Sequence, residues 1–387
     1  MRCIYLVLSV FLGMMAGGVQ AQHLAAAKVR KAKRTADNST VAAAILVEAQ
    51  TGKVLFSHNA DLPRPPASTQ KLLLELVMMD AVAAGEVSLE DTVHVSAEAS
   101  RINGSQVFLR AGEAMPLGEM MKAAMVASAN DACVAIAEHM SGTEANFVAR
   151  MNAKARELGL AHTRVTNSYG LDTTPEGQGN ITTARELAQI AVALLRHYPE
   201  VLEVSSLRHA PFREGTQTMH NTNKLLDRFA GMDGLKTGFT SRAGFCLVGT
   251  AQRRGMRLVS VVLGARNTRV RERETVRLLE WGFEHYAKVP LAEAGQSMGL
   301  VTLDWGAEPA VNAVLSNPLA VVLRTEQRRQ LRSELELPAK HPAPVRQGQG
   351  LGKLKVSLGD SLLAEVDLVA EKSVDRVGLW ERLMSYF

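Results

Sequence analysis

The sequence predicts an α+β protein: a mixed sheet with a helical cluster, then a small all-β domain and a C-terminal amphipathic helix. Strand patterns lie on both sides of a long helical region, which favours one sheet that encloses a cluster of helices. After residue 289 the chain changes to short apolar runs broken by Gly, Pro and Asn, which is typical of a small β domain. The last residues are apolar on one helical face only.

Length and composition place the chain among globular proteins of two or three domains. It has 387 residues, and a domain usually takes about 150. Hydrophobic residues make up 47% and charged residues 21%, which excludes a disordered, collagen-like or multi-span membrane chain. Aromatic residues make up only 5%, which disfavours stacking on nucleic acid bases. A net charge of +5 fits solubility better than a polyanion partner, so we expect no nucleic acid partner.

The first residues have the pattern of an export signal. Arg2 gives a positive start, an apolar run follows over Ile4–Met15, and Val19-Gln20-Ala21 is a small-residue cleavage site. The run is short for a bilayer span, so we interpret residues 1–21 as a cleaved signal, with an uncleaved anchor as the alternative. Residues 22–39 are basic, lack apolar periodicity and are expected to form a flexible leader.

The first domain is predicted over residues 40–289. It opens with strands at 41–48 and 53–56, joined by a short turn, before three prolines lead to a helix over 68–84. That helix is apolar nearly all round, as in a buried helix, while Glu75 and Asp80 argue against a membrane span. The remaining predicted helices are 117–127, 131–140, 144–158, 183–198 and 271–286, and the remaining strands are 235–237, 244–251 and 256–264.

The rest of the chain is predicted as a β-rich domain over 290–372 and a helix over 373–387. The β-rich domain shows apolar runs at 319–323, 335–337, 354–356 and 362–369. On the terminal helix one face collects Val374, Val377, Trp380, Leu383, Met384 and Phe387. Such a helix suits a membrane interface; the alternative is docking on the second domain or on another chain.

The cysteines and histidines predict no metal centre. Cys3 leaves with the signal, and Cys133 and Cys246 each lie in an apolar stretch. Export would allow them to pair, but two buried thiols is the favoured interpretation. No Cys or His cluster has metal-ligand spacing, so neither a metal nor another cofactor is expected.

Ser68-Thr69-Gln70-Lys71 is the first candidate for chemistry. At a helix start, positions i and i+3 are neighbours, so the hydroxyl of Ser68 and the amine of Lys71 share one face. A lysine becomes a base for serine when burial or a nearby cation lowers its pKa. About one Ser-x-x-Lys is expected by chance in a chain of this length, so this pattern alone does not identify a catalytic site.

Two further segments strengthen the case for a catalytic site. Ser128-Ala129-Asn130 lies at a bend between two predicted helices, and Lys236-Thr237-Gly238 lies on a predicted strand. Each has an ordinary structural interpretation by itself, as a helix cap, loop polar residues or a strand end. The three segments in this order are hard to obtain by accident and are typical of serine β-lactamases and penicillin-binding proteins.

The chain resembles the low-molecular-weight penicillin-binding proteins of the D-Ala-D-Ala carboxypeptidase type, serine peptidases that trim peptidoglycan stem peptides. The likeness runs from about Val41 to the C-terminus and includes Asn167-Ser168-Tyr169-Gly170-Leu171-Asp172 and Gly264-Ala265-Arg266. It implies a β-lactamase/transpeptidase-like first domain. A β-rich second domain and an amphipathic terminal helix also match this subgroup and are usually missing from β-lactamases.

The resemblance implies a role for each candidate residue. Ser68 would attack the carbonyl between two terminal D-alanines, Lys71 would take its proton, and Ser128 would pass that proton to the leaving amine. The remaining residues would bind the substrate. Asn130 would hydrogen-bond its backbone, and its terminal carboxylate would be bound by Lys236, Thr237 and Arg271. Gly238 would let the substrate strand lie close, and the N–H groups of Phe239 and Ser68 would form the oxyanion hole.

Phe239 departs from the family pattern, because carboxypeptidases often have His directly after Lys-Thr-Gly. Lys-Thr-Gly-Phe-Thr also occurs in related D,D-endopeptidases that cut cross-links, which makes such an enzyme the main alternative. A β-lactamase is disfavoured, since no Glu-x-x-Leu-Asn segment precedes Lys236. A weakly catalytic wall-binding regulator is a third alternative. Expected partners are stem peptides, β-lactams as inhibitors and a membrane surface, at the outer face of the cytoplasmic membrane or in the periplasm; the oligomeric state is not predicted.

Overall fold

The computed structural model describes residues 41–172, 175 and 178–378, so the expected export signal and basic leader lie outside the described residues. The described chain forms two compact units. The first contains Leu258–Leu279 and the described residues up to Ala251; the second contains Gln252–Arg257 and the described residues from Glu280 onward. The second of its two segments starts at Glu280, inside a helix, and the sequence predicts a domain boundary after residue 289.

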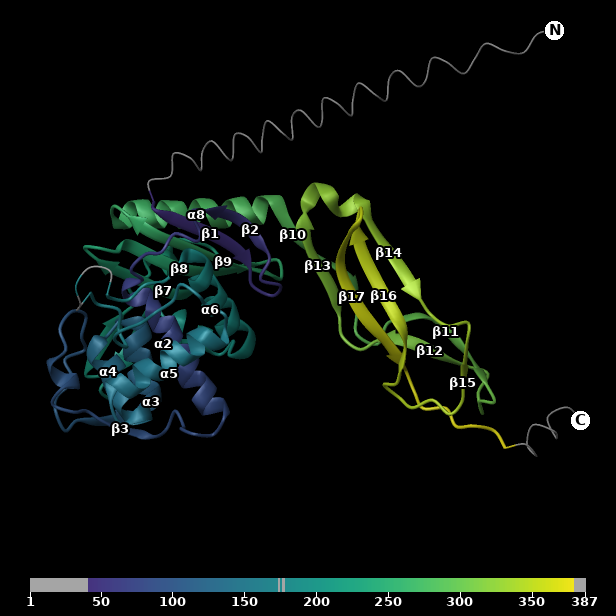
Figure 1. Ribbon diagram of the computed structural model, residues 1–387, viewed down its shortest axis with the longest axis horizontal. Helices are drawn as coiled ribbons and strands as arrows, with labels where there is room; N and C mark the ends of the chain where they lie inside the picture. Colours follow the sequence, from purple (N-terminus) through teal and green to yellow (C-terminus); the bar gives the residue numbers. More distant parts are fainter. Residues whose placement is uncertain (1–40, 173–174, 176–177, 379–387) are drawn as a thin grey trace, which may run out of the picture. The chain divides into compact units, whose positions relative to one another are not determined.

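A five-stranded sheet in the order β2-β1-β9-β8-β7 forms one layer of the first unit (Figure 1). Its strands are β1 (Ala43–Glu48), β2 (Val54–His58), β7 (Met232–Thr240), β8 (Gly244–Arg253) and β9 (Met256–Ala265). The described pairs β1–β2, β1–β9 and β7–β8 are antiparallel, in contrast to the mixed strand directions expected from the sequence. Hairpins between consecutive strands produce this order, and only β1–β9 joins segments remote in sequence.

Helices cover both faces of this sheet, with α8 on one side and the cluster around α2 on the other (Figure 1). The helices are α2 (Lys71–Ala83), α3 (Leu117–Val126), α4 (Asn130–Ser141), α5 (Glu144–Glu157), α6 (Ala184–His197), α7 (Val201–Ser205) and α8 (Thr268–His285), with 3-10 turns η1 (Ala67–Gln70), η2 (Ala99–Arg101) and η3 (Lys224–Asp227). The central helix α2 packs against α3, α4, α5 and α6. Its burial on nearly every side explains its apolar sequence.

Two short antiparallel strand pairs in the helical region were not predicted from the sequence. They are β3 (Thr92–His94) with β4 (Ala114–Pro116), and β5 (His209–Phe212) with β6 (Gln217–His220). Strands of three or four residues carry too little alternation to be recognised by periodicity.

The second unit is β-rich, as predicted. Strands β10 (Tyr286–Ala292) and β13 (Leu319–Arg324) pair with each other, and a six-stranded sheet has the order β14-β16-β17-β12-β11-β15. The other elements are β11 (Ser297–Asp304), β12 (Ala310–Leu315), η4 (Thr325–Gln330), β14 (Leu331–Glu336), β15 (Lys340–Pro342), β16 (Gly350–Leu358) and β17 (Ser361–Ala370). Alternate Val and Leu residues of these strands form one core.

The end of the described chain corrects the start of the predicted helix over 373–387, because residues 374–378 are not helical. Val374 is 3% exposed and bridges to Val345, and Arg376 bridges to Gly306, so residues 374–377 continue the β domain in extended form. The apolar side chain of Val374 belongs to the core of the second unit, not to an amphipathic face. Val377, also expected on that face, donates its N–H to the carbonyl of Trp305 (2.8 Å), and the residues of that face from Trp380 to Phe387 lie outside the described residues. Among the described residues, no helix is long and apolar enough to cross a bilayer.

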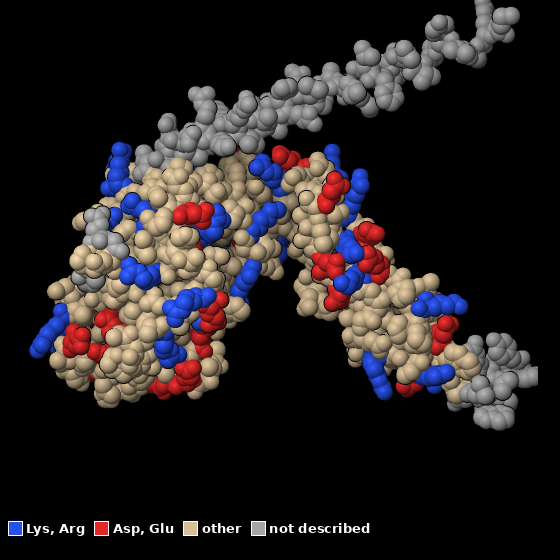
Figure 2. All heavy atoms as spheres, in the orientation of Figure 1, with Lys and Arg blue, Asp and Glu red and all other residues tan. Residues whose placement is uncertain are grey.

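Acidic and basic side chains are interspersed on the face shown in Figure 2. In the second unit, Lys353 pairs with Glu365, Lys355 with Glu336 and Lys372 with Glu308. The two cysteines, Cys133 and Cys246, are buried and unpaired, which confirms the interpretation of two buried thiols.

Candidate active site

Ser68 lies in the 3-10 turn η1, one residue after Ala67. The sequence predicts that Ser68 begins the α-helix, but the α-helix begins at Lys71. The turn is held by close packing: Ala67 has φ 49°, and a β-carbon on Gly170 would lie 2.1 Å from the carbonyl oxygen of Ala67. Only glycine allows this approach. The side-chain amide of Gln70 also donates to the carbonyl of Asn167 (2.5 Å), so the segment over 167–170 holds the turn at two points.

The amine of Lys71 is fully buried and surrounded by oxygen atoms. Its Nζ lies 2.5 Å from the carbonyl oxygen of Ser128, 2.7 Å from Oδ1 of Asn130, 3.2 Å from Oγ of Ser128 and 3.4 Å from Oγ of Ser68. Burial lowers the pKa of Lys71, with Cys133 and Asp131 acting in the opposite direction. The environment therefore favours the uncharged amine relative to a lysine in water.

The hydrogen-bond geometry fits an uncharged amine. A neutral lysine has two N–H donors and one lone pair. Its two closest partners, the Ser128 carbonyl and Asn130 Oδ1, accept only and would take both hydrogens. The lone pair is then left for a hydroxyl, and the hydroxyls of Ser68 and Ser128 are both within 3.4 Å of the nitrogen.

Ser128 and Asn130 lie where α3 ends and α4 begins, as the sequence predicted. Ser128 has φ 61°, a left-handed conformation that turns its side chain and carbonyl toward Lys71. The amide of Asn130 is oriented by Asn103, whose carbonyl accepts from Nδ2 (2.8 Å), so that Oδ1 faces the lysine. Left-handed residues other than glycine, such as Ser128, recur at functional sites.

Lys236 is the second buried lysine at this place. It lies on β7, which packs against η1 and α2, and its Nζ donates to the carbonyl of Thr237 (3.2 Å). Burial first, and then the positive charge that Lys71 carries when it is protonated, hold the pKa of Lys236 well below its usual range. The two amines thus share one buried electrostatic environment, in which two positive charges disfavour each other.

Strand β7 is the edge strand of its sheet and passes directly beside the nucleophile turn. A β-carbon on Gly238 would lie 2.9 Å from the backbone nitrogen of Ser68. Thr237 is buried, and its hydroxyl lies 2.6 Å from that of Thr222. An edge strand with a hydroxyl beside it suits an extended peptide that ends in a carboxylate.

Arg271 and Phe239 occupy different surroundings. Arg271 on α8 is buried, its Nε has no hydrogen-bond partner, and burial lowers its pKa. Its positive charge is a minor cause that lowers the pKa of Lys236. Phe239 is 52% exposed at the end of β7, and its ring lies 4.2 Å from the ring of Phe245.

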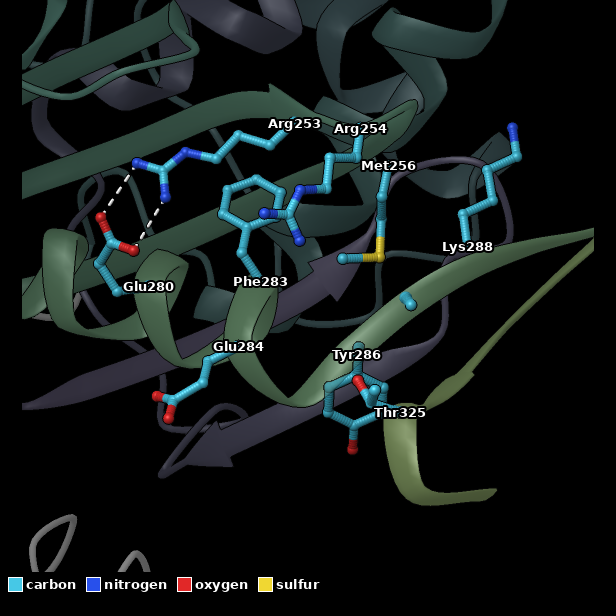
Figure 3. Close-up of a pocket in the computed structure, with 10 residues that line it drawn as sticks. Arg253, Arg254, Met256, Glu280, Phe283, Glu284, Tyr286, Lys288 and Thr325 are labelled. Atoms are coloured by element: carbon cyan, nitrogen blue, oxygen red, sulfur yellow. Dashed lines mark hydrogen bonds and ion pairs between the residues drawn. The ribbon is translucent and has the colours of Figure 1, made fainter. Parts of the chain in front are cut away.

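A hollow of about 640 Å³ in the second unit contains none of the predicted site residues (Figure 3). Arg253 crosses one side of it and holds Glu280 through two hydrogen bonds of 2.8 and 3.0 Å. Tyr286, Lys288 and Glu284 contribute charges of both signs and an aromatic ring.

Two family models match the chain along most of its length. The model described as D-alanyl-D-alanine carboxypeptidase matches residues 29–267. The chain belongs to that family. The model for the C-terminal domain of penicillin-binding protein 5 matches residues 286–376, which covers the second β-rich unit.

Individual carboxypeptidases resemble most of the chain. D-alanyl-D-alanine carboxypeptidase DacF of Bacillus subtilis is 34% identical over 351 residues, which is 89% of each chain. The D-alanyl-D-alanine endopeptidase of Escherichia coli is 33% identical, but over 211 residues, 53% of this chain and 65% of that protein. Similarity to the endopeptidase is therefore confined to part of the chain.

Solved structures support the same fold. Penicillin-binding protein 5 of Haemophilus influenzae has a TM-score of 0.73 at 30% identity and covers 88% of this chain and 98% of its own. Penicillin-binding protein D2 of Listeria monocytogenes, in an ampicillin-bound form, has a TM-score of 0.58 at 32% identity and covers 63% of this chain and 98% of its own. The transpeptidase-like domain followed by a β-rich domain is thus a shared architecture.

Three residues beside the carboxypeptidase-family segments were missed by sequence reasoning: Thr222, Asn103 and Glu75. Thr222 and Asn103 lie in segments with no pattern of their own, so only the fold places them beside Thr237 and Asn130. Glu75 had a signal, since it is an acid within an otherwise apolar stretch of helix. It is fully buried one turn after Lys71.

Proposed function

We propose that this protein is a serine-type D-Ala-D-Ala carboxypeptidase, which removes the terminal D-alanine from peptidoglycan pentapeptide stems through an acyl-enzyme on Ser68. The observation that carries the proposal is the amine of Lys71, buried within 3.4 Å of Ser68 Oγ and oriented by Ser128 and Asn130. A buried amine next to a hydroxyl is the arrangement that activates a serine without histidine.

The first step forms an ester. Oγ of Ser68 attacks the carbonyl carbon between the two D-alanines while uncharged Lys71 takes the hydroxyl proton. The tetrahedral intermediate collapses as its C–N bond breaks, and Ser128, 3.2 Å from the lysine, passes the proton to the leaving amine. Backbone N–H groups of Ser68 and Phe239 hold the oxyanion; one such donor contributes about 2.7–4 kcal/mol.

The substrate binds along the edge of the sheet. Its peptide runs beside β7 at Gly238, where no side chain obstructs the backbone. Asn130 contacts its backbone, and its terminal carboxylate lies near Thr237, with Lys236 and Arg271 supplying positive charge behind it. Water then attacks the ester and returns the proton to Ser68.

The same nucleophile accounts for inhibition by β-lactams. Attack on the strained lactam carbonyl opens the ring and leaves a stable ester on Ser68, since no leaving group departs from the site. The relative from Listeria monocytogenes is described in an ampicillin-bound form, which supports β-lactam binding in this fold.

A D,D-endopeptidase that cuts peptide cross-links is the second candidate. The exposed aromatic ring of Phe239 favours it, as does the partial similarity to an endopeptidase of Escherichia coli. The match to a carboxypeptidase-type C-terminal domain and the 89% coverage by DacF favour the first candidate.

Mass spectrometry on two substrates tests the proposal. The purified chain from Gln22 is incubated with a monomeric pentapeptide stem and, separately, with a cross-linked dimer. Loss of one alanine from the monomer supports a carboxypeptidase, and cleavage of the dimer alone supports an endopeptidase. Fluorescent penicillin that labels the wild type and not Ser68→Ala shows that the nucleophile is active. If neither protein is labelled, the result favours the third alternative, a weakly catalytic wall-binding regulator.

We also propose that the protein is exported and bound peripherally to the outer face of the cytoplasmic membrane. The apolar run over 4–15 and the apolar residues after 379 support this proposal. Fractionation of cells that produce the full chain tests it: protein in the cytosol with residues 1–21 still attached would contradict export.

A further inference from the structure

Thr222 lies on the segment between β6 and η3, outside the three segments that the sequence indicates. Its hydroxyl accepts a hydrogen bond from the hydroxyl of Thr237 on the edge strand β7 (2.6 Å). Thr237 is 5% exposed, whereas Thr222 is half-buried. Thr222 is therefore the more open residue of the pair, beside the strand along which the substrate is proposed to bind.

Two buried asparagines hold the backbone on either side of Thr222. The side-chain oxygen of Asn221 accepts from the backbone N–H of Asn223 (2.8 Å), which closes a turn around Thr222. The side-chain amide of Asn223 donates to the carbonyl of Gly234 on β7 (3.3 Å). Thr222 is thus fixed relative to the strand that carries Thr237, as the binding of a small charged group requires.

A count of the hydroxyl hydrogens shows what this pair can offer a ligand. Each hydroxyl has one hydrogen and two lone pairs. Thr237 uses its hydrogen in the bond to Thr222, so the hydrogen that remains for a ligand belongs to Thr222. Within the described part of the chain, no protein acceptor lies within hydrogen-bond distance of it. The bond that Thr222 accepts also polarises its own O–H, which makes it a better donor.

The surroundings of this spare hydrogen suit an anion. The amine of Lys236, which the proposed function keeps positive, donates to the carbonyl of Thr237 (3.2 Å). No carboxylate of the described residues bonds to either threonine. A hydroxyl binds a carboxylate oxygen more strongly than a neutral acceptor, because the charge strengthens the bond.

We propose that Thr222 is a specificity-determining residue: its hydroxyl donates to the terminal carboxylate of the substrate, and Thr237 orients that hydroxyl. The inference rests on the proposed function, which brings the terminal carboxylate of the stem peptide to Thr237. It adds to that contact a residue from outside the three segments. Thr222 thereby helps to select a free peptide end over an end whose carboxylate is blocked.

The experiment compares two pentapeptide stems that end in D-Ala-D-Ala, one with a free carboxylate and one with a C-terminal carboxamide. We expect Thr222→Val to lower kcat/KM for the carboxylate peptide by about 10-fold to 100-fold, the value of a hydrogen bond to a charged group. Turnover of the carboxamide peptide should fall much less, because its end carries no charge. Thr222→Ser keeps the hydroxyl and should keep the preference for the carboxylate.

Thr218→Val is the matched control, since Thr218 is an exposed threonine on β6, and it should change neither rate. Equal losses for the two peptides in Thr222→Val would overturn the inference, because they would indicate a general disturbance of β7. A preference that Thr222→Ser fails to restore would overturn it as well.

Binding to a chain that cannot react separates this inference from the proposed function. Ser68→Ala, alone and combined with Thr222→Val, is titrated with the same two peptides, and binding is followed by NMR signals of the peptide. Tighter binding of the carboxylate peptide by Ser68→Ala, lost in the double variant, supports the role of Thr222 even if the wild type hydrolyses neither peptide. The same preference in both variants, or no preference in Ser68→Ala, refutes it.

Discussion

The β-carbon that an alanine would place at Gly238 lies 2.9 Å from the backbone nitrogen of Ser68 and 3.0 Å from that of Thr69. The edge strand β7 therefore lies against the nucleophile turn at backbone distance, although the two segments are remote in the sequence. Backbone atoms move less readily than the end of a side chain. The place of Ser68 thus depends directly on β7 having no side chain at this residue.

Gly238→Ala should reduce acylation by about 100-fold, the effect of misplacing reacting groups by about 1 Å. The added methyl group would push β7 away from the turn and disturb both oxyanion donors. The acylation rate with fluorescent penicillin measures this loss of activity. Gly350→Ala is the matched control, because nothing lies within 4 Å of its new β-carbon, in a strand of the second unit. Equal rates for both variants would show that the close approach is not required.

Lys71→Ala should reduce acylation by a factor of about 100 to 10,000, the range for loss of a positioned base. Lys71→Arg should be equally inactive, because a guanidinium keeps its proton at every working pH. Circular dichroism checks that both variants fold. If Lys71→Arg acylates at a substantial fraction of the wild-type rate, proton transfer to residue 71 is not part of the step.

The wild-type acid limb should reflect the same lysine. Burial lowers the pKa of Lys71, so the uncharged base is available at lower pH than for an ordinary lysine. As pH falls through that lowered pKa the amine gains a proton, and the acylation rate should fall tenfold per pH unit. A stopped-flow profile with penicillin measures this limb. A rate that increases toward acid pH would contradict the assignment.

Ser128→Gly and Ser128→Ala should differ in stability while both lose acylation. Each removes the hydroxyl that lies 3.2 Å from Lys71 Nζ. Ser128 has φ 61°, a conformation that costs an alanine about 1–2 kcal/mol and a glycine little. We therefore expect Ser128→Gly to unfold in urea with a free energy about 1 kcal/mol higher than Ser128→Ala. The opposite order would mean that the backbone relaxes at this position.

Much of the fold was predictable because its long elements have clear periods. The helical pattern over 117–127 is observed as α3 (Leu117–Val126), and the strand pattern over 256–264 as β9 (Met256–Ala265). The residue at which the nucleophile helix begins was not predictable, because the left-handed conformation of Ala67 and the close packing of Gly170 are tertiary effects. Val374 was misplaced for a similar reason: an apolar residue spaced for a helix face also fits a strand that completes a core.

The site was predictable only as three segments in order. Their sequence patterns indicate Ser68, Lys71, Ser128 and Lys236, yet no spacing rule says that Lys71 Nζ reaches Asn130 Oδ1 at 2.7 Å. Nor does the sequence reveal Thr222, which meets Thr237 across a distance of fifteen positions. Contacts between segments depend on how the sheet and helices close, which local patterns do not encode.

Removal of residues 379–387 should release the protein from membranes without reducing turnover of a soluble pentapeptide. The deletion should not begin at Val374, because Val374 and Val345 exchange two backbone hydrogen bonds of 2.9 Å inside the β-rich unit. Deletion from 374 should therefore lower the melting temperature, while deletion from 379 should not. Membrane pelleting and calorimetry measure the two effects, and a shorter protein that still pellets would place the anchor elsewhere.

Arg213 holds the segment over 103–113, which also supports Asn130. Removal of the charge of Glu113, the partner of Arg213, should loosen this segment. Its guanidinium donates to both oxygens of Glu113 (2.6 and 3.0 Å) and to the carbonyls of Val107 and Phe108. The same segment orients Asn130 through the carbonyl of Asn103.

Glu113→Gln should therefore cost about 1–3 kcal/mol of unfolding free energy, since hydrogen bonds to charged groups are worth that much when largely buried. The hydrogen bond from Arg213 is the main cause that lowers the pKa of Glu113. Its contribution is present above the ordinary glutamate pKa and is lost as pH falls through the lowered one, so the difference between wild type and variant should shrink in acid. Asp61→Asn is the control: Arg185 also holds Asp61 by two hydrogen bonds, but in an exposed pair that should contribute under about 1 kcal/mol. Equal losses in the two variants at neutral pH would show that the clamp is worth no more than a surface ion pair.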